Sequence, residues 1–184
     1  MFSEIKKISS LLLSVAFSSI GFIASITVTV LAAREVSSNP LFVGFPNAVG
    51  VGGAVLGTRM IYLISKTNSQ LNALAFTFLI GAFGGAIMFY SLIIDSFLVL
   101  LLGAFILGIG QSATLQTRYA ASFVAGTKFK ATALSLAVWF SVFGSVFGPR
   151  MVGSYSNFFE NIFNSDLIVG YVIAFVGMLF AAAS

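Results

Sequence analysis

Six long runs of apolar residues follow one another along this chain, and most of the charged residues fall between them. The runs cover about residues 10–33, 40–64, 71–94, 97–116, 131–152 and 167–183. A helix needs roughly 20 apolar residues to cross a hydrocarbon core about 30 Å thick. Barrel strands would instead show alternating segments of about 10 residues. The pattern predicts an all-α membrane protein with a single domain over residues 1–184, a bundle of six transmembrane helices.

Composition excludes a soluble fold and removes most catalytic chemistry. Hydrophobic residues make up 59% of the chain and charged residues 8%, whereas a soluble domain carries roughly 25% charged residues. The chain has no Cys and no His, which removes thiol nucleophiles, disulfides, Cys/His metal sites and imidazole acid–base chemistry. We therefore expect no enzyme, no metal site and no cofactor. A serine acting with a Lys or Arg is the catalytic alternative left open.

The basic residues orient the chain in the membrane. They are scattered singly rather than gathered in a patch, so we expect no nucleic-acid partner. With loops assigned alternately to the two sides, Arg34 and Arg150 lie opposite the N-terminus. The other basic residues share its side: Lys6, Lys7, Arg59, Lys66, Arg118, Lys128 and Lys130. Cytoplasmic loops carry the excess of Lys and Arg, which predicts a multi-pass protein of the cell inner membrane with both termini in the cytoplasm.

Two amides lie at membrane depth, where a polar group without a partner costs several kcal/mol. Asn47 stands in the second run beside Pro46, which loosens a helix, and Gln111 stands in the fourth run. Each either bonds to a neighbouring helix or contacts a transported solute. No Asp or Glu sits in the middle of any run, so a coupled proton would have to be carried elsewhere.

Two further residues are candidates for lining a cavity. Ser18 belongs to a stripe of small residues at three- and four-residue spacing, with Ser14, Gly21 and Ser25, which lines either a cavity or a packing seam. Trp139 lies too deep in the fifth run for an interfacial belt, so it faces either the core or a cavity.

Three segments between residues 107 and 153 carry a resemblance to a known family. Gln116, Arg118, Tyr119, Ala120 and Ala121 read Q-x-R-Y-A-A, and residues 133–139 read A-L-S-L-x-V-W. Gly144, Gly148 and Pro149 read G-x-x-x-G-P. Together these resemble the fourth helix, cytoplasmic loop and fifth helix of major facilitator superfamily permeases, in which the last element is an antiporter motif at the outer gate.

The chain departs from the family at three places. Arg150 follows Pro149 where the motif continues with glycines, and Ala104 stands where the fourth-helix motif carries an Arg before Gly108. The region 57–70 lacks the Asp of the family's loop between helices two and three. These departures count against proton antiport and against a charge lock at the inner gate.

The resemblance implies secondary-active transport of a small solute, by efflux or antiport, through a cavity lined by helices one, two, four and five. Family members have two six-helix halves around the solute path, and this chain corresponds to the amino-terminal half. We expect a truncated or half-length transporter that pairs with a second copy or another chain. The competing hypothesis is a non-transporting remnant or an assembly subunit that docks another membrane protein.

Overall fold

A computed structural model describes residues 2–37, 40–163 and 165–184, without the side chains of residues 2–5, 128, 157, 161 and 163. The side chain of Lys128, used above for orientation, is thus outside the described part. Over the described residues the chain is all-α. The elements are α1 Phe2–Val36, the 3-10 helix η1 Pro40–Phe42, α2 Phe45–Thr67, α3 Gln70–Ile93, α4 Phe97–Val124, α5 Gly126–Phe163 and α6 Ile168–Ala183. The expected all-α membrane bundle is confirmed.

Five segments are long and apolar enough to cross a membrane, which does not confirm the expected count of six. They are Lys6–Val36, Pro40–Thr67, Gln70–Ile93, Phe97–Val124 and Phe129–Ser156. The sixth apolar run forms α6, a helix of 16 residues, which is roughly 24 Å long at 1.5 Å per residue.

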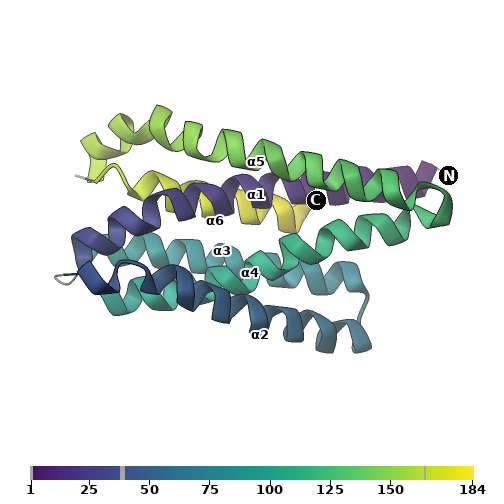
Figure 1. Ribbon diagram of the computed structural model, residues 1–184, viewed down its shortest axis with the longest axis horizontal. Coiled ribbons are helices and arrows are strands. Elements are labelled where there is room, and N and C mark those ends of the chain that lie inside the picture. The colour runs from purple at the N-terminus through teal and green to yellow at the C-terminus, as the bar shows by residue number, and fades with distance from the viewer. Residues whose placement is uncertain (1, 38–39, 164) are drawn as a thin grey trace.

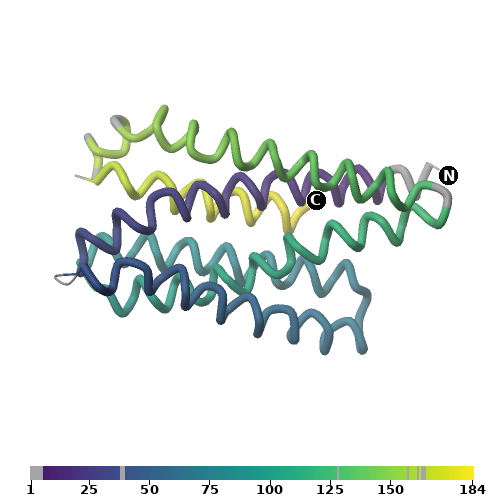
Figure 2. The backbone as a smooth tube through the Cα atoms, viewed as in Figure 1, coloured from purple at the N-terminus to yellow at the C-terminus, as the bar shows by residue number. Residues whose placement is uncertain are grey.

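The helices form two layers of three (Figure 1). One layer holds α1, α5 and α6, and the other holds α2, α3 and α4. The α2–α3 and α4–α5 connections lie at the end where the N-terminus lies, and the other connections lie at the opposite end (Figure 2). Successive helices are therefore antiparallel, as alternate crossing of a membrane requires.

The two layers meet where α1 contacts α4 and where α3 contacts α6. Glycines allow the closest approaches inside the second layer: a Cβ placed on Gly81 of α3 would lie 2.6 Å from the Cα of Gly110 on α4. In a membrane, where no hydrophobic force drives helices together, such backbone contact is what binds them. The largest fully buried side chains include Phe78, Met88 and Tyr171.

The edge helices α2 and α5 are the least covered. Within their apolar stretches 17% of α2 and 22% of α5 is buried, against 44% of α3 and 56% of α1 and α4. Large exposed apolar side chains include Val51 and Val55 on α2 and Phe143 and Val146 on α5. Lipid or another protein surface must cover both edges.

The fourth and fifth helices are longer than the apolar runs that predict them. The run 97–116 becomes α4, which continues to Val124, and the run 131–152 becomes α5, which covers Gly126–Phe163. Only Ala125 separates the two helices, and Gly126 has φ +69°, a backbone conformation that glycine adopts without strain. The expected cytoplasmic loop is therefore one tight turn.

Pro46 and Pro149 lie at different places in their helices. Pro46 lies in the first turn of α2, where its missing N–H has no helical partner to lose, so it starts the helix and does not loosen it. Pro149 lies inside α5, which continues to Phe163 rather than ending near residue 152. It leaves the carbonyl of Ser145 without its helical donor.

Candidate functional site

Asn47 and Gln111 line the same cavity, although they come from different helices. The cavity has a volume of about 240 Å³ and lies between α1, α2 and α4. Both amides are half-buried, and within the described part of the chain neither side chain has a hydrogen-bond partner. Asn47 lies in the first turn of α2 and Gln111 in the middle of α4. Without partners, the two amides leave donors and acceptors available to a solute or to water.

The other polar side chains that line this cavity already donate hydrogen bonds to the backbone of α1. The Ser25 hydroxyl donates to the carbonyl of Phe22 at 2.7 Å, and the Thr29 hydroxyl donates to the carbonyl of Ser25 at 2.7 Å. The amides of Asn47 and Gln111 are therefore the groups that can bind directionally here.

A second cavity of about 160 Å³ adjoins the first, and Phe22 and Gln111 line both. It lies between α1, α4 and α5. Its polar lining is Ser19, Gln111, Thr114, Arg118, Ser141 and Ser145. We call the two cavities together the polar groove.

One face of α4 supplies three groups to the polar groove. Gln111, Thr114 and Arg118 follow at intervals of three and four residues, which stacks their side chains along one side of a helix. The sequence places Arg118 in a cytoplasmic loop, whereas the structure places it inside α4. It is half-buried, and its Nε is buried without a hydrogen-bond partner.

Ser18 and Trp139 lie away from the polar groove. Ser18 is 0% exposed, and its hydroxyl donates to the carbonyl of Ser14 at 2.7 Å, which is the geometry of a packing seam. Trp139 is 66% exposed and so does not face the core. It precedes Ser141 by two residues, which puts the two side chains about 200° apart around the helix.

The glycines of the G-x-x-x-G-P segment set the distance between α5 and α1. A Cβ on Gly144 would lie 2.5 Å from the Cβ of Ser19, and one on Gly148 would lie 3.0 Å from the carbonyl oxygen of Ile20. Pro149, half-buried, follows directly. The motif therefore packs against Ser19, one of the α1 residues that line the polar groove.

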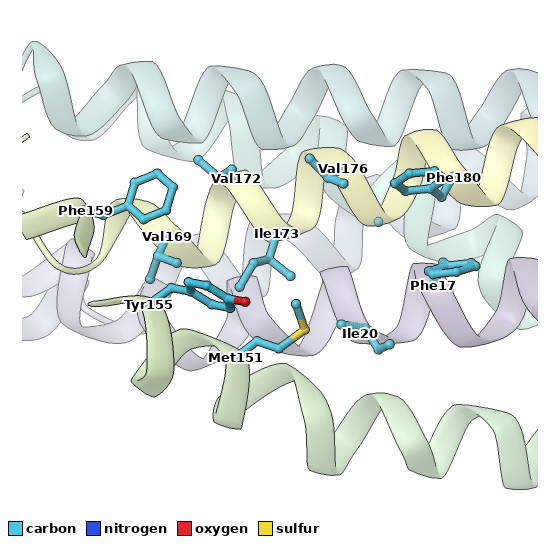
Figure 3. Close-up of a pocket in the computed structure, with 11 residues that line it drawn as sticks. Phe17, Ile20, Met151, Tyr155, Phe159, Val169, Val172, Ile173, Val176 and Phe180 are labelled. Atoms are coloured by element: carbon cyan, nitrogen blue, oxygen red, sulfur yellow. The ribbon is translucent and has the colours of Figure 1, made fainter. Parts of the chain in front are cut away.

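A larger cavity, of about 370 Å³, lies elsewhere, between α1, α5 and α6. Figure 3 shows its lining, in which Phe17, Val176 and Phe180 stand beside one another and the hydroxyl of Tyr155 is the polar atom drawn. The sequence did not predict this apolar cavity. Its walls match hydrocarbon and offer little for directional recognition.

Two curated proteins of Bacillus subtilis (strain 168) are similar to this chain. The uncharacterized MFS-type transporter YdeG is 29% identical over 169 residues, which cover 92% of this chain and 39% of that protein. The uncharacterized MFS-type transporter YddS is 29% identical over 176 residues, which cover 96% of this chain and 40% of that protein.

The chain thus spans about two fifths of the length of the relatives it matches. No protein-family model matches the chain. No solved structure matches it either. Both relatives are named MFS-type transporters, which agrees with the resemblance carried by residues 107–153.

Proposed function

We propose that this chain is the amino-terminal half of a major facilitator superfamily transporter, and that it moves a small solute by alternating access along the polar groove. The observation that carries the proposal is the pair of amides without partners, Asn47 on α2 and Gln111 on α4, on one cavity wall. Helices α1, α2, α4 and α5 all contribute to the groove. These are the helices that the family resemblance implies.

A second half would face the polar groove and close it. In transporters of this kind the solute site lies near the membrane midplane, between two repeats that rock against one another. The edge helices α2 and α5 have large apolar side chains exposed beside the groove, and the relatives are more than twice as long as this chain. Both observations support a partner half, from the same polypeptide, a second copy or another chain.

The test is transport by the chain assembled with its second half in proteoliposomes. A mixture of small solutes is supplied outside, and the solutes that accumulate are identified by mass spectrometry. Asn47→Ala and Gln111→Ala should each lower the rate about tenfold, because one lost polar contact to a solute costs about 1–3 kcal/mol.

Asn68→Ala is the matched control, since Asn68 is an exposed amide at the end of α2. Its rate should equal that of the wild type. Wild-type rates in both groove variants would show that the solute passes elsewhere. If no solute moves in the complete assembly, the docking-subunit hypothesis replaces transport.

A further inference from the structure

Two buried hydroxyls in the polar groove have no hydrogen-bond partner. Ser19 is 5% exposed and Thr114 is 4% exposed, and neither side-chain oxygen bonds to any described group. Both line the smaller cavity. A buried hydroxyl without a partner destabilises a fold by about 1–3 kcal/mol. A ligand group that bonds to Ser19 or Thr114 would recover this free energy.

The other hydroxyls of α1 and α4 do not share this arrangement. Serines and threonines in helices usually donate to the backbone carbonyl three or four residues earlier. Every other described serine and threonine on α1 and α4 has its hydroxyl bonded to a backbone carbonyl. Ser19 and Thr114 are the exceptions.

Arg118 adds a positive charge to the same cavity. Its Nε is buried without a partner, and no carboxylate is among the described residues that line the cavity. Glu35 is near the end of α1, Asp95 follows α3 and Asp166 precedes α6, so these carboxylates lie at the end of the bundle opposite the α4–α5 turn (Figure 2). A partly buried guanidinium is stabilised when an anion supplies the missing charge.

We infer that Ser19, Thr114 and Arg118 bind the carboxylate of a small organic anion. The transported solute then belongs to this class. The inference rests on the proposed function, because the solute reaches this cavity along the polar groove. Charge-assisted hydrogen bonds from a guanidinium and hydroxyls are the strong contacts that a carboxylate accepts. About 160 Å³ holds the carboxylate.

The rest of the solute extends into the adjoining cavity. That space of about 240 Å³ has apolar walls at Phe22, Met88 and Leu107 and the two amides at its polar side. An anion fits these two cavities when its carboxylate lies in the smaller one and its uncharged, apolar or weakly polar body lies in the larger one. A solute with a second charge on its body would meet no counter-charge there among the described lining residues.

Binding can be measured on the chain itself in lipid nanodiscs, by calorimetric titration with benzoate and with its neutral counterpart benzamide at constant ionic strength. Benzoate should bind and benzamide should bind at least about tenfold more weakly, because it lacks the charge that Arg118 recognises. Equal affinities, or no binding of benzoate, would overturn the inference.

Two pairs of variants assign the binding to these residues. Arg118→Gln should lower the affinity for benzoate at least about tenfold, whereas Arg59→Gln, an exposed arginine on α2, should leave it unchanged. Thr114→Val and Ser19→Ala should each lower it several-fold. Ser154→Ala should not, since that hydroxyl is exposed on α5 away from the polar groove and donates to the carbonyl of Arg150 at 2.9 Å.

A carboxylate of the second half is the competing partner for Arg118. In that case benzoate binds to the chain in isolation but not to the complete assembly, and this result would also overturn the inference. Circular dichroism would show whether each variant folds. If Arg118→Gln does not fold, Thr114→Val and Ser19→Ala provide the test instead. Transport of uncharged solutes without benzoate binding would refute only the anion site, whereas benzoate binding without transport would refute only the proposed function.

Discussion

The backbone of Gly108 on α4 lies directly against the backbone of Gly50 on α2, so that a Cβ on Gly108 would overlap the carbonyl group of Gly50. This contact holds α2 beside α4 at the level of the amide-lined cavity, which Gly50 also lines. No rotamer change can relieve the overlap, because both partners are main chain.

Gly108→Ala should therefore destabilise the protein by about 1–3 kcal/mol, the usual cost of overpacking a close contact. The measurement is thermal or denaturant unfolding in detergent. Gly52→Ala is the control on α2, because Gly52 is exposed and has nothing within 4 Å of its added Cβ. An unchanged stability of Gly108→Ala would show that α2 does not pack against α4 as described.

Two glycines of α5, Gly144 and Gly153, should differ in the same way. Gly144→Ala should lower stability and weaken benzoate binding together, because the added Cβ meets the Cβ of Ser19 at 2.5 Å. Gly153→Ala should change neither property, since nothing lies within 4 Å of that position. Unfolding in detergent and calorimetric titration would be run on both variants. A loss of binding in Gly153→Ala instead would contradict the packing of α5 on α1.

Ser18→Ala should transport at the wild-type rate. The hydroxyl is fully buried and donates to a carbonyl of its own helix, and that carbonyl keeps its helical N–H donor in the variant. The change in stability should stay within about 1 kcal/mol. The rate is measured in the same proteoliposomes as for Asn47→Ala. A large loss of transport would place Ser18 on the solute path after all.

The fluorescence of Trp139 reports what covers α5. It is the one tryptophan in the sequence and is 66% exposed, so lipids with brominated acyl chains should quench it strongly in the chain on its own. Addition of a second half that covers this face would remove the quenching. Emission that brominated lipids never affect would mean that Trp139 is already covered in the chain.

The absence of native cysteine makes the orientation easy to test. Asn68→Cys and Ile94→Cys place thiols at opposite ends of the bundle, and both positions are exposed. If the N-terminus is cytoplasmic, a membrane-impermeant maleimide labels Ile94→Cys in intact cells and labels Asn68→Cys only after permeabilisation. The reverse pattern would invert the proposed topology.

Hydropathy located the helices well but misplaced several of their ends. Apolar runs mark where a helix is surrounded by hydrocarbon or protein, and helices continue into polar sequence beyond that point. For this reason α4 continues through Arg118 to Val124 and α5 begins at Gly126, although the residues between 117 and 130 read as a loop. The run that predicts α6 covers residues 167–183, which is shorter than the roughly 20 residues of a full span, so the sequence already indicates a short helix.

The site was only partly predictable. Asn47 and Gln111 could be chosen because amides are rare and costly in a membrane, but their position on one cavity depends on how α2 packs against α4. Ser19 and Thr114 were missed because a single hydroxyl in a helix usually bonds to its own backbone. The spacing of Gln111, Thr114 and Arg118 was available in the sequence and would have indicated a polar face on α4.

The turn at Ala125 leaves almost no slack between α4 and α5. The two helices are therefore coupled at this turn. Arg118 lies on α4 close to the turn, and Gly144 and Gly148 contact α1 farther along α5. A tilt of α5 that changes its contact with α1 would therefore also move the end of α4 that carries Arg118.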